Sequence, residues 1–165
     1  MEVFLVHPGG PFWAKKDAGA WSIPKGEFDT EEDPASAAKR EFKEETGIDV
    51  PKGDMTGLGV IKASSSKMIH SWAIQADVDP KHVKSNVFDM EWPPKSGQSQ
   101  QFPEVDKAAW FPLAAAKTKI VKGQVALLEK LAELTGADLD AGPPATTTAK
   151  PAKKPTAPDG QVSLF

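Results

Sequence analysis

Apolar residues gather in short runs along the first two thirds of the chain, and these runs predict the strands of a sheet. Residues 3–6, Val-Phe-Leu-Val, are uniformly apolar and predict a short buried strand. The segments 57–63 and 67–78 predict two further strands joined by a serine-rich turn. Residues 108–112, Ala-Ala-Trp-Phe-Pro, predict another strand.

Two segments carry the signals of helices. Asp33 is a good N-cap and Pro34 suits a first helical position, so a helix is predicted to begin at residue 34. Gly47 suits a left-handed C-terminal cap, so this helix should span residues 34–46. Residues 123–134 have the spacing of an amphipathic helix. Its predicted apolar face consists of Leu127, Leu128, Leu131 and Leu134.

Three stretches lack a sustained period and predict loops, at residues 7–13, 21–33 and 79–103. The last is too long for a mere connection, which favours a functional role. After Gly136 the chain is rich in Pro, Ala, Thr and Lys and has almost no large apolar residues until its last five. Such a segment cannot offset its chain entropy by burial. We therefore expect one folded domain at 1–136 and a disordered tail at 137–165.

Composition narrows the class of protein. The 165 residues suffice for one domain with a core, and 39 % of them are hydrophobic. The absence of cysteine excludes disulfides and thiolate chemistry and fits a reducing cytoplasm, where we expect the protein to lie. No segment has the roughly 20 apolar residues of a membrane helix, and the start of the chain lacks the features of a secretory signal. A net charge of −3 gives no general case for nucleic-acid binding.

The first predicted helix crowds three carboxylates on one face. Glu41, Glu44 and Glu45 are three and four residues apart, a spacing at which like charges repel. Arg40, the only arginine of the chain, directly precedes them. A solvated acidic face is the simplest interpretation of such a cluster. The alternative is a cation site, because carboxylates that repel one another alone are stable around a hard divalent ion.

The surrounding spacing resembles the Nudix box of the Nudix hydrolases. Gly26 is followed by five residues and Glu32, then by seven residues and the run Arg-Glu-Phe-Lys-Glu-Glu-Thr-Gly-Ile at 40–48. This matches every defining position of the box, and a looser resemblance covers about residues 1–136. The resemblance implies an α/β fold, an α/β/α sandwich with a mixed sheet. It also implies hydrolysis of a nucleoside diphosphate linked to another moiety.

The same resemblance implies roles for the residues of the box. Magnesium, or manganese, would be held by Glu41, Glu44 and Glu45, with the carbonyl of Gly26 as a further oxygen ligand. Arg40 would orient a box carboxylate through a two-pronged hydrogen bond. The structural residues of the motif would be Glu32, which braces the loop against the helix, and Gly47, which ends the helix.

Residues outside the box must identify the substrate. The segment 21–27, Trp-Ser-Ile-Pro-Lys-Gly-Glu, resembles the branch that includes dinucleoside polyphosphate hydrolases and RNA pyrophosphohydrolases. Lys25 is placed there to meet a phosphate, or it is a solvated loop lysine. The segment 102–111 also resembles this branch, and it makes Glu104 either a general base or further metal ligand, or a plain loop carboxylate. Trp92 and Phe102 are candidates for stacking on a base, with loop anchoring as the alternative.

These features favour a dinucleoside polyphosphate as substrate. The alternatives are MutT-type removal of oxidised nucleoside triphosphates, removal of the 5′-pyrophosphate of RNA, and a non-catalytic module that only binds a nucleotide. A Nudix domain usually opens with a strand before the one at 3–6. We therefore expect that the first strand is absent, that the start codon is misassigned, or that another element takes its place.

The chain ends in Gln-Val-Ser-Leu-Phe, at residues 161–165. This sequence resembles the peptide by which bacterial proteins dock on the replication sliding clamp. The resemblance implies that Leu164 and Phe165 enter an apolar pocket and that Gln161 hydrogen-bonds nearby, at the end of a proline-rich tether. The alternative is that this apolar end folds back on the domain.

Overall fold

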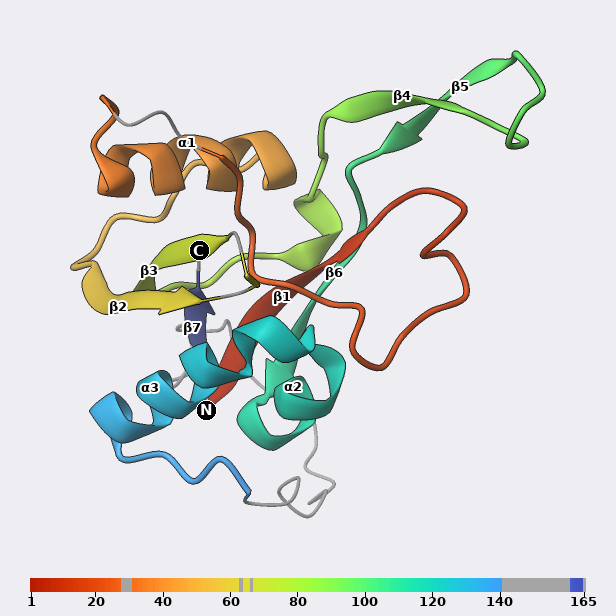
Figure 1. Cartoon of the computed structure of the whole chain (residues 1–165). Helices are drawn as coiled ribbons and strands as arrows, with labels where there is room; N and C mark the ends of the chain where they lie inside the picture. Colours follow the sequence, from red (N-terminus) through yellow and green to blue (C-terminus); the bar gives the residue numbers. More distant parts are fainter. Residues whose placement is uncertain (28–30, 63, 66, 141–160, 165) are drawn as a thin grey trace, which may run out of the picture.

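The computed structural model describes residues 1–27, 31–62, 64–65, 67–140 and 161–164, the last range by its backbone only. A five-stranded sheet forms its centre, in the order β2-β3-β7-β1-β6 (Figure 1). Its strands are β1 (Glu2–Pro8), β2 (Thr56–Lys62), β3 (Met68–Gln75), β6 (Val105–Pro112) and β7 (Gln161–Leu164). The sheet is mixed, because β1 and β7 run parallel whereas the other neighbours are antiparallel.

Helices cover both faces of the sheet, as the expected α/β/α sandwich requires. One face carries α1 (Pro34–Thr46), and the other carries α2 (Leu113–Lys119) and α3 (Val125–Thr135), as Figure 1 shows. Short 3₁₀ turns, η1 (Pro80–His82) and η2 (Lys122–Gln124), complete the helical elements. In the described part of the chain, every helix is too short or too polar to span a bilayer.

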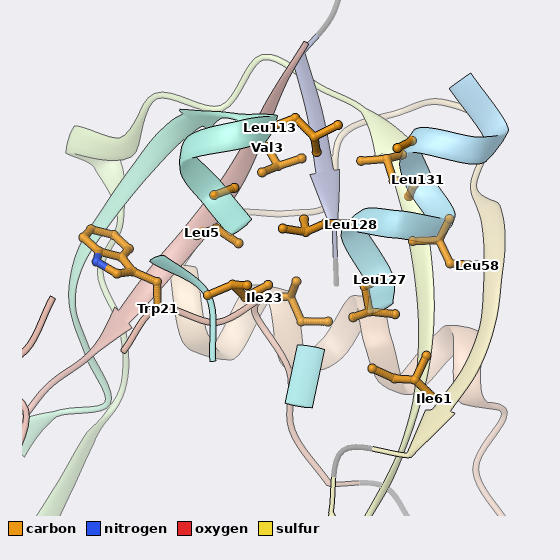
Figure 2. Close-up of a cluster of buried hydrophobic side chains, with 14 residues drawn as sticks. Val3, Leu5, Trp21, Ile23, Leu58, Ile61, Leu113, Leu127, Leu128 and Leu131 are labelled. Carbon is orange, nitrogen blue, oxygen red and sulfur yellow. The ribbon is translucent and has the colours of Figure 1, made fainter. Parts of the chain in front are cut away.

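The two faces are set by the alternation of side chains along β1. Successive residues of a strand point to opposite faces. Val3 and Leu5 join the cluster that packs against α2 and α3, in which Leu127, Leu128 and Leu131 are almost fully buried (Figure 2). Leu134 differs from the sequence expectation, since it is 59 % exposed. It lies in the last turn of α3, where Ala132 is the last buried residue.

The segment 79–103 contains more structure than the sequence indicates. It folds into η1 and a two-stranded hairpin, β4 (Val87–Glu91) and β5 (Ser99–Pro103), which projects from the main body (Figure 1). Half-buried residues alternate with exposed ones along β4, whereas β5 is exposed except at Phe102, so the hairpin carries only a weak apolar signal in the sequence. The hairpin leads the chain to the start of β6, and Glu104 lies between the end of β5 and the start of β6.

Residues 161–164 also differ from the expectation of a tail outside the fold. They form β7, between β1 and β3 in the middle of the sheet. This agrees with the alternative to clamp docking, in which the apolar end folds back on the domain. It also agrees with the alternative that another element takes the place of the usual first strand. Residues 137–140 also differ from the expected disorder, since Ala137 and Leu139 pack against the core and Asp140 accepts from Lys117 at 2.7 Å. The other residues for which disorder is expected, 141–160 and Phe165, lie outside the described residues.

Candidate active site

Local capping fixes where α1 begins and ends. Asp33 is in an extended conformation, and its side chain accepts the backbone N–H of Ser36 at 2.9 Å. Gly47 adopts the left-handed conformation, with φ of 71°, and its N–H donates to the Lys43 carbonyl at 2.7 Å. The sequence prediction of both boundaries is confirmed.

Phe42 anchors the helix and so orients its acidic face. Its side chain is fully buried against the sheet, with its ring centroid 6.4 Å from that of Phe4. Thr46, one turn later, is also buried and donates its hydroxyl to the Phe42 carbonyl. With this side of α1 facing the core, the side chains of Glu41 and Glu44 stay partly exposed, Glu41 at 14 % and Glu44 at 43 %.

Arg40 holds the box together through both sides of its guanidinium. Its Nε and Nη2 donate to the two carboxylate oxygens of Glu32, at 3.1 and 3.0 Å, which makes a two-pronged pair. Its Nη1 donates to Glu41 at 2.6 Å and to Glu44 at 3.2 Å. These bonds, with Glu32 first, raise the pKa of Arg40 above its ordinary value.

The two-pronged bond therefore goes to Glu32, and the box carboxylates share the remaining nitrogen. Nη2 of Arg40 also donates to the Glu27 carbonyl at 3.2 Å, which ties the preceding loop to the helix. The hydrogen bond from Arg40 keeps the pKa of Glu32 below its ordinary value. Glu32, which precedes α1, thus contacts Arg40 of the helix, and its bracing role stays a prediction.

The loop before the helix brings backbone groups to the other carboxylates. Ser22 exchanges two backbone hydrogen bonds of 2.9 Å with Val6, which ties this loop to β1. Lys25 then donates its backbone N–H to Glu45 Oε2 at 2.9 Å. Gly26 lies so close to Glu41 that a Cβ at this position would overlap the Glu41 carboxylate. Only glycine allows this approach of backbone to carboxylate.

Glu45 is the carboxylate whose ionisation the fold disfavours. Burial raises its pKa to about 7, and the charges of Glu41 and Glu104 add to the rise. The backbone N–H and the charge of Lys25 act in the opposite direction. A bound cation would offset the cost of a second and third negative charge at this place.

The donor set fits a hard divalent cation. Three carboxylates on one helix face and a nearby backbone segment offer only oxygen ligands, which magnesium prefers. Within the described ranges, no three His, Asp or Glu side chains are already arranged around one point. Arg40 engages Glu41 and Glu44, and the Lys25 amide engages Glu45. Each of these bonds uses one oxygen of its carboxylate, and a carboxylate has two acceptor oxygens. Cation binding therefore requires the side chains to converge, but it does not require the contacts with Arg40 and Lys25 to break.

A hollow of about 600 Å³ opens beside the loop that contacts the carboxylates. Lys25 and Gly26 form one part of its wall, and the remaining lining comes from Glu27, Ser64, Lys67, Met68, Ile69, Val121, Gly123 and Gln124. A smaller hollow of about 50 Å³ is lined by Glu41 and Trp72, among other residues. The larger hollow combines apolar walls with two lysines, a lining suited to a nucleotide.

The other residues that the sequence singles out lie apart from this hollow. Glu104 is exposed between β5 and β6, and its negative charge contributes to the raised pKa of Glu45. Trp92 and Phe102 are on the β4–β5 hairpin. Trp92 packs edge-on against Phe12, with ring centroids 5.4 Å apart. Neither aromatic residue is among the residues that line the two hollows.

Gln124 lines the hollow but is missed by reasoning from the sequence. Its side chain is 1 % exposed, and its Oε1 accepts the backbone N–H of Ile23 at 3.0 Å. It joins the start of α3 to the loop that precedes Lys25. A glutamine just before an amphipathic helix carries no signal of such a role, because its partner is 101 residues away.

The family of the protein follows from a comparison with family models. The model of the NUDIX domain matches residues 1–131 of the 165-residue chain. The chain therefore belongs to the Nudix family, and it is a hydrolase of phosphoanhydride bonds in derivatives of nucleoside diphosphates. Hydrolases of this family generally use a divalent metal such as Mg²⁺. Comparisons with curated proteins and with solved structures find no match.

Proposed function

We propose that this hydrolase cleaves dinucleoside polyphosphates by attack of water on a phosphoanhydride. The observation that carries the proposal is the position of the box carboxylates next to Lys25, Gly26 and the large hollow. A phosphate chain that reaches from the hollow to the carboxylates passes Lys25. An ammonium group there can offset phosphate charge.

Magnesium or manganese fits the carboxylates of Glu41, Glu44 and Glu45, with the Gly26 carbonyl as a further candidate. When bound, the ion supplies neutralisation of phosphate charge and polarisation of the phosphoryl group. Arg40 acts through the carboxylates, since it holds Glu41 and Glu44 on one nitrogen while its other side is fixed on Glu32. Arg40 is therefore a positioning residue.

Glu104 is the general base of this proposal. It is exposed, and it lies near enough to Glu45 to influence the Glu45 pKa. A base must reach the water that attacks phosphorus. The variant Glu104→Gln should lower kcat about 100-fold or more, in the range of general base catalysis, while leaving KM and the melting temperature nearly unchanged. An unchanged kcat would assign the role of base to another residue.

The hollow provides a place for a nucleoside. Ile69, Met68 and Val121 give it apolar surface, and the buried amide of Gln124 gives it a polar group of fixed orientation. A base held there also suits the runner-up, MutT-type hydrolysis of oxidised nucleoside triphosphates. RNA 5′-pyrophosphate removal is the third candidate. Stacking by Trp92 and Phe102 stays a prediction and requires the hairpin to take part in binding.

A substrate panel separates these candidates. The wild type and Glu45→Gln are incubated with magnesium and with diadenosine polyphosphates, normal and oxidised nucleoside triphosphates, or 5′-triphosphorylated RNA, and the products are separated chromatographically. The proposal predicts the highest kcat/KM on diadenosine polyphosphates and the loss of that activity in the variant. A preference for oxidised triphosphates would replace it with the runner-up. Tight nucleotide binding without any product would indicate a non-catalytic module.

Docking of residues 161–165 on a sliding clamp also stays a prediction. The backbone of Gln161 to Leu164 is paired in the sheet, so clamp docking requires β7 to leave it. Phe165, which the resemblance places in the apolar pocket of the clamp, lies outside the described residues. A clamp pull-down with Phe165→Ala as control tests this partner.

A further inference from the structure

Among the described residues, the central sheet is continuous only through β7. On one side, β7 pairs in parallel with β1, where Val162 lies opposite Val3. On its other side it pairs antiparallel with β3, where Val162 lies opposite Gln75 and Ser163 opposite Ile74. In the described part of the chain, no other strand pairing joins the β2–β3 pair to the β1–β6 pair. Residues 161–164 therefore hold two halves of the sheet together.

Helix α1 packs across the junction that β7 bridges. The core cluster beneath α1 contains Phe42 from the helix, Phe4 from β1 and Ile74 from β3. Phe4 and Ile74 both lie opposite Ser163 in the strand register. A change in the spacing of β1 and β3 would thus act on the surface that supports the helix and its carboxylates.

The strand that fills this position is short and joined to the body by a long connection. Only four residues pair, so β7 contributes few main-chain hydrogen bonds. Between it and the described end of the domain lie residues 141–160, which contain no large apolar side chain. Twenty residues can reach up to about 70 Å when extended. This connection sets no geometric obstacle to the departure and return of the strand.

We propose that the gap between β1 and β3 is a peptide-binding site, occupied reversibly by residues 161–164 of the same chain. An extended peptide enters by adding a strand to the edges of its two neighbours, so its main chain supplies most of the affinity. Occupancy of the site fixes α1 and thereby favours hydrolysis, and this consequence rests on the proposed function. The peptide site itself does not.

The proposal is tested with the full chain carrying a specific protease site within residues 141–160. The folded protein is cut, and a fluorescent peptide of residues 157–165 is added and followed by anisotropy. The matched control is the same peptide with Ser163→Pro, because proline lacks the N–H of an interior strand and is excluded there. We expect saturable exchange of the first peptide and at least about tenfold weaker binding of the second. Equal binding of both, or none by either, would overturn the proposal.

The rate of hydrolysis by the cut protein is a second measurement, which tests whether occupancy of the site affects activity. We expect the rate to fall when the cut protein is diluted and to recover with the wild-type peptide but not with the proline peptide. If the peptide exchanges but the rate of hydrolysis changes neither on dilution nor on addition of the peptide, occupancy of the site does not act on hydrolysis through α1. If the peptide exchanges but no panel substrate is cleaved, the proposed function fails while the peptide site stands.

The intact chain provides a measurement that does not depend on cutting. Ser163→Pro is compared with Ala152→Pro by hydrogen–deuterium exchange. We expect the amides of β1 and β3 to exchange at least about tenfold faster in the first variant only. Unchanged exchange in both would overturn the proposal. Light scattering decides whether the occupant comes from the same chain, since a strand exchanged between copies would double the mass and contradict occupancy in cis.

Discussion

Replacing Glu45 by glutamine should make the metal-free protein more stable at neutral to alkaline pH while abolishing its activity. The fold raises the pKa of Glu45 from the ordinary 4.5 to about 7, chiefly by burial. Between these values the folded state holds a proton that the unfolded state has released. The contribution of Glu45 to the free energy of unfolding is therefore fully present below the unfolded-state pKa of 4.5. It is lost as pH rises through the folded-state pKa of about 7.

The magnitude follows from the same pair of values. Each pKa unit corresponds to about 1.4 kcal/mol, so the wild type loses at most about 3.5 kcal/mol of unfolding free energy across this window. Glutamine has no charge to desolvate, and its amide oxygen can still accept the Lys25 N–H. The variant should lack this pH dependence and exceed the wild type by about 1–3 kcal/mol at about pH 8.

The assay is urea unfolding in the presence of a chelator, at about pH 5 and about pH 8, for wild type and variant. Glu133→Gln, at an exposed position of α3, is the matched control and should behave like the wild type. The variant should also lose hydrolysis at least about 100-fold with magnesium, because it lacks a charged ligand. Equal pH dependence in wild type and Glu45→Gln would refute the reasoning, and so would failure of the variant to fold.

Three further changes probe the rest of the site. Gly26→Ala should push the nearby carboxylate away and cost about 100-fold in kcat/KM, whereas Gly57→Ala, where the nearest atom is 3.9 Å away, should have little effect on the same rate. Phe42→Ala should lower the unfolding free energy by about 3–5 kcal/mol in urea titrations; a loss below about 1 kcal/mol would mean that the ring does not anchor α1. Arg40→Lys should raise the magnesium concentration for half-maximal rate about 10- to 100-fold with little change in melting temperature, since lysine cannot form the fork; an unchanged magnesium requirement would contradict its positioning role.

How far the sequence predicts the structure depends on where the signal for each element lies. Helix α1 is predicted to the residue because Asp33 and Gly47, its two capping residues, are adjacent to it in sequence. The contact of Arg40 with Glu41 and Glu44 is likewise local, so the box could be located from spacing alone. What depends on neighbours within a helical turn or two is visible in the sequence.

Elements that depend on partners far away in the chain are not visible in the sequence. The β4–β5 hairpin gives only a weak apolar signal, because just Phe88, Met90 and Phe102 of its strand residues are half-buried and the others are exposed. Strand β7 is defined by pairing with β1 and β3, and nothing in its four residues specifies a place in the centre of a sheet. The contact of Gln124 with Ile23 spans nearly two thirds of the chain. Such features become visible only when the chain is folded.

The solitary arginine offers a direct spectroscopic view of the site. Arg40 is the only arginine of the 165 residues, and its Nε donates to Glu32 while its terminal nitrogens contact the box. A sample enriched in ¹⁵N at arginine alone would thus give a single Nε–H resonance, originating from the middle of the carboxylate cluster. Titrating magnesium or nucleotide into that sample would report rearrangement of the guanidinium without mutation, chemical tag or crystal.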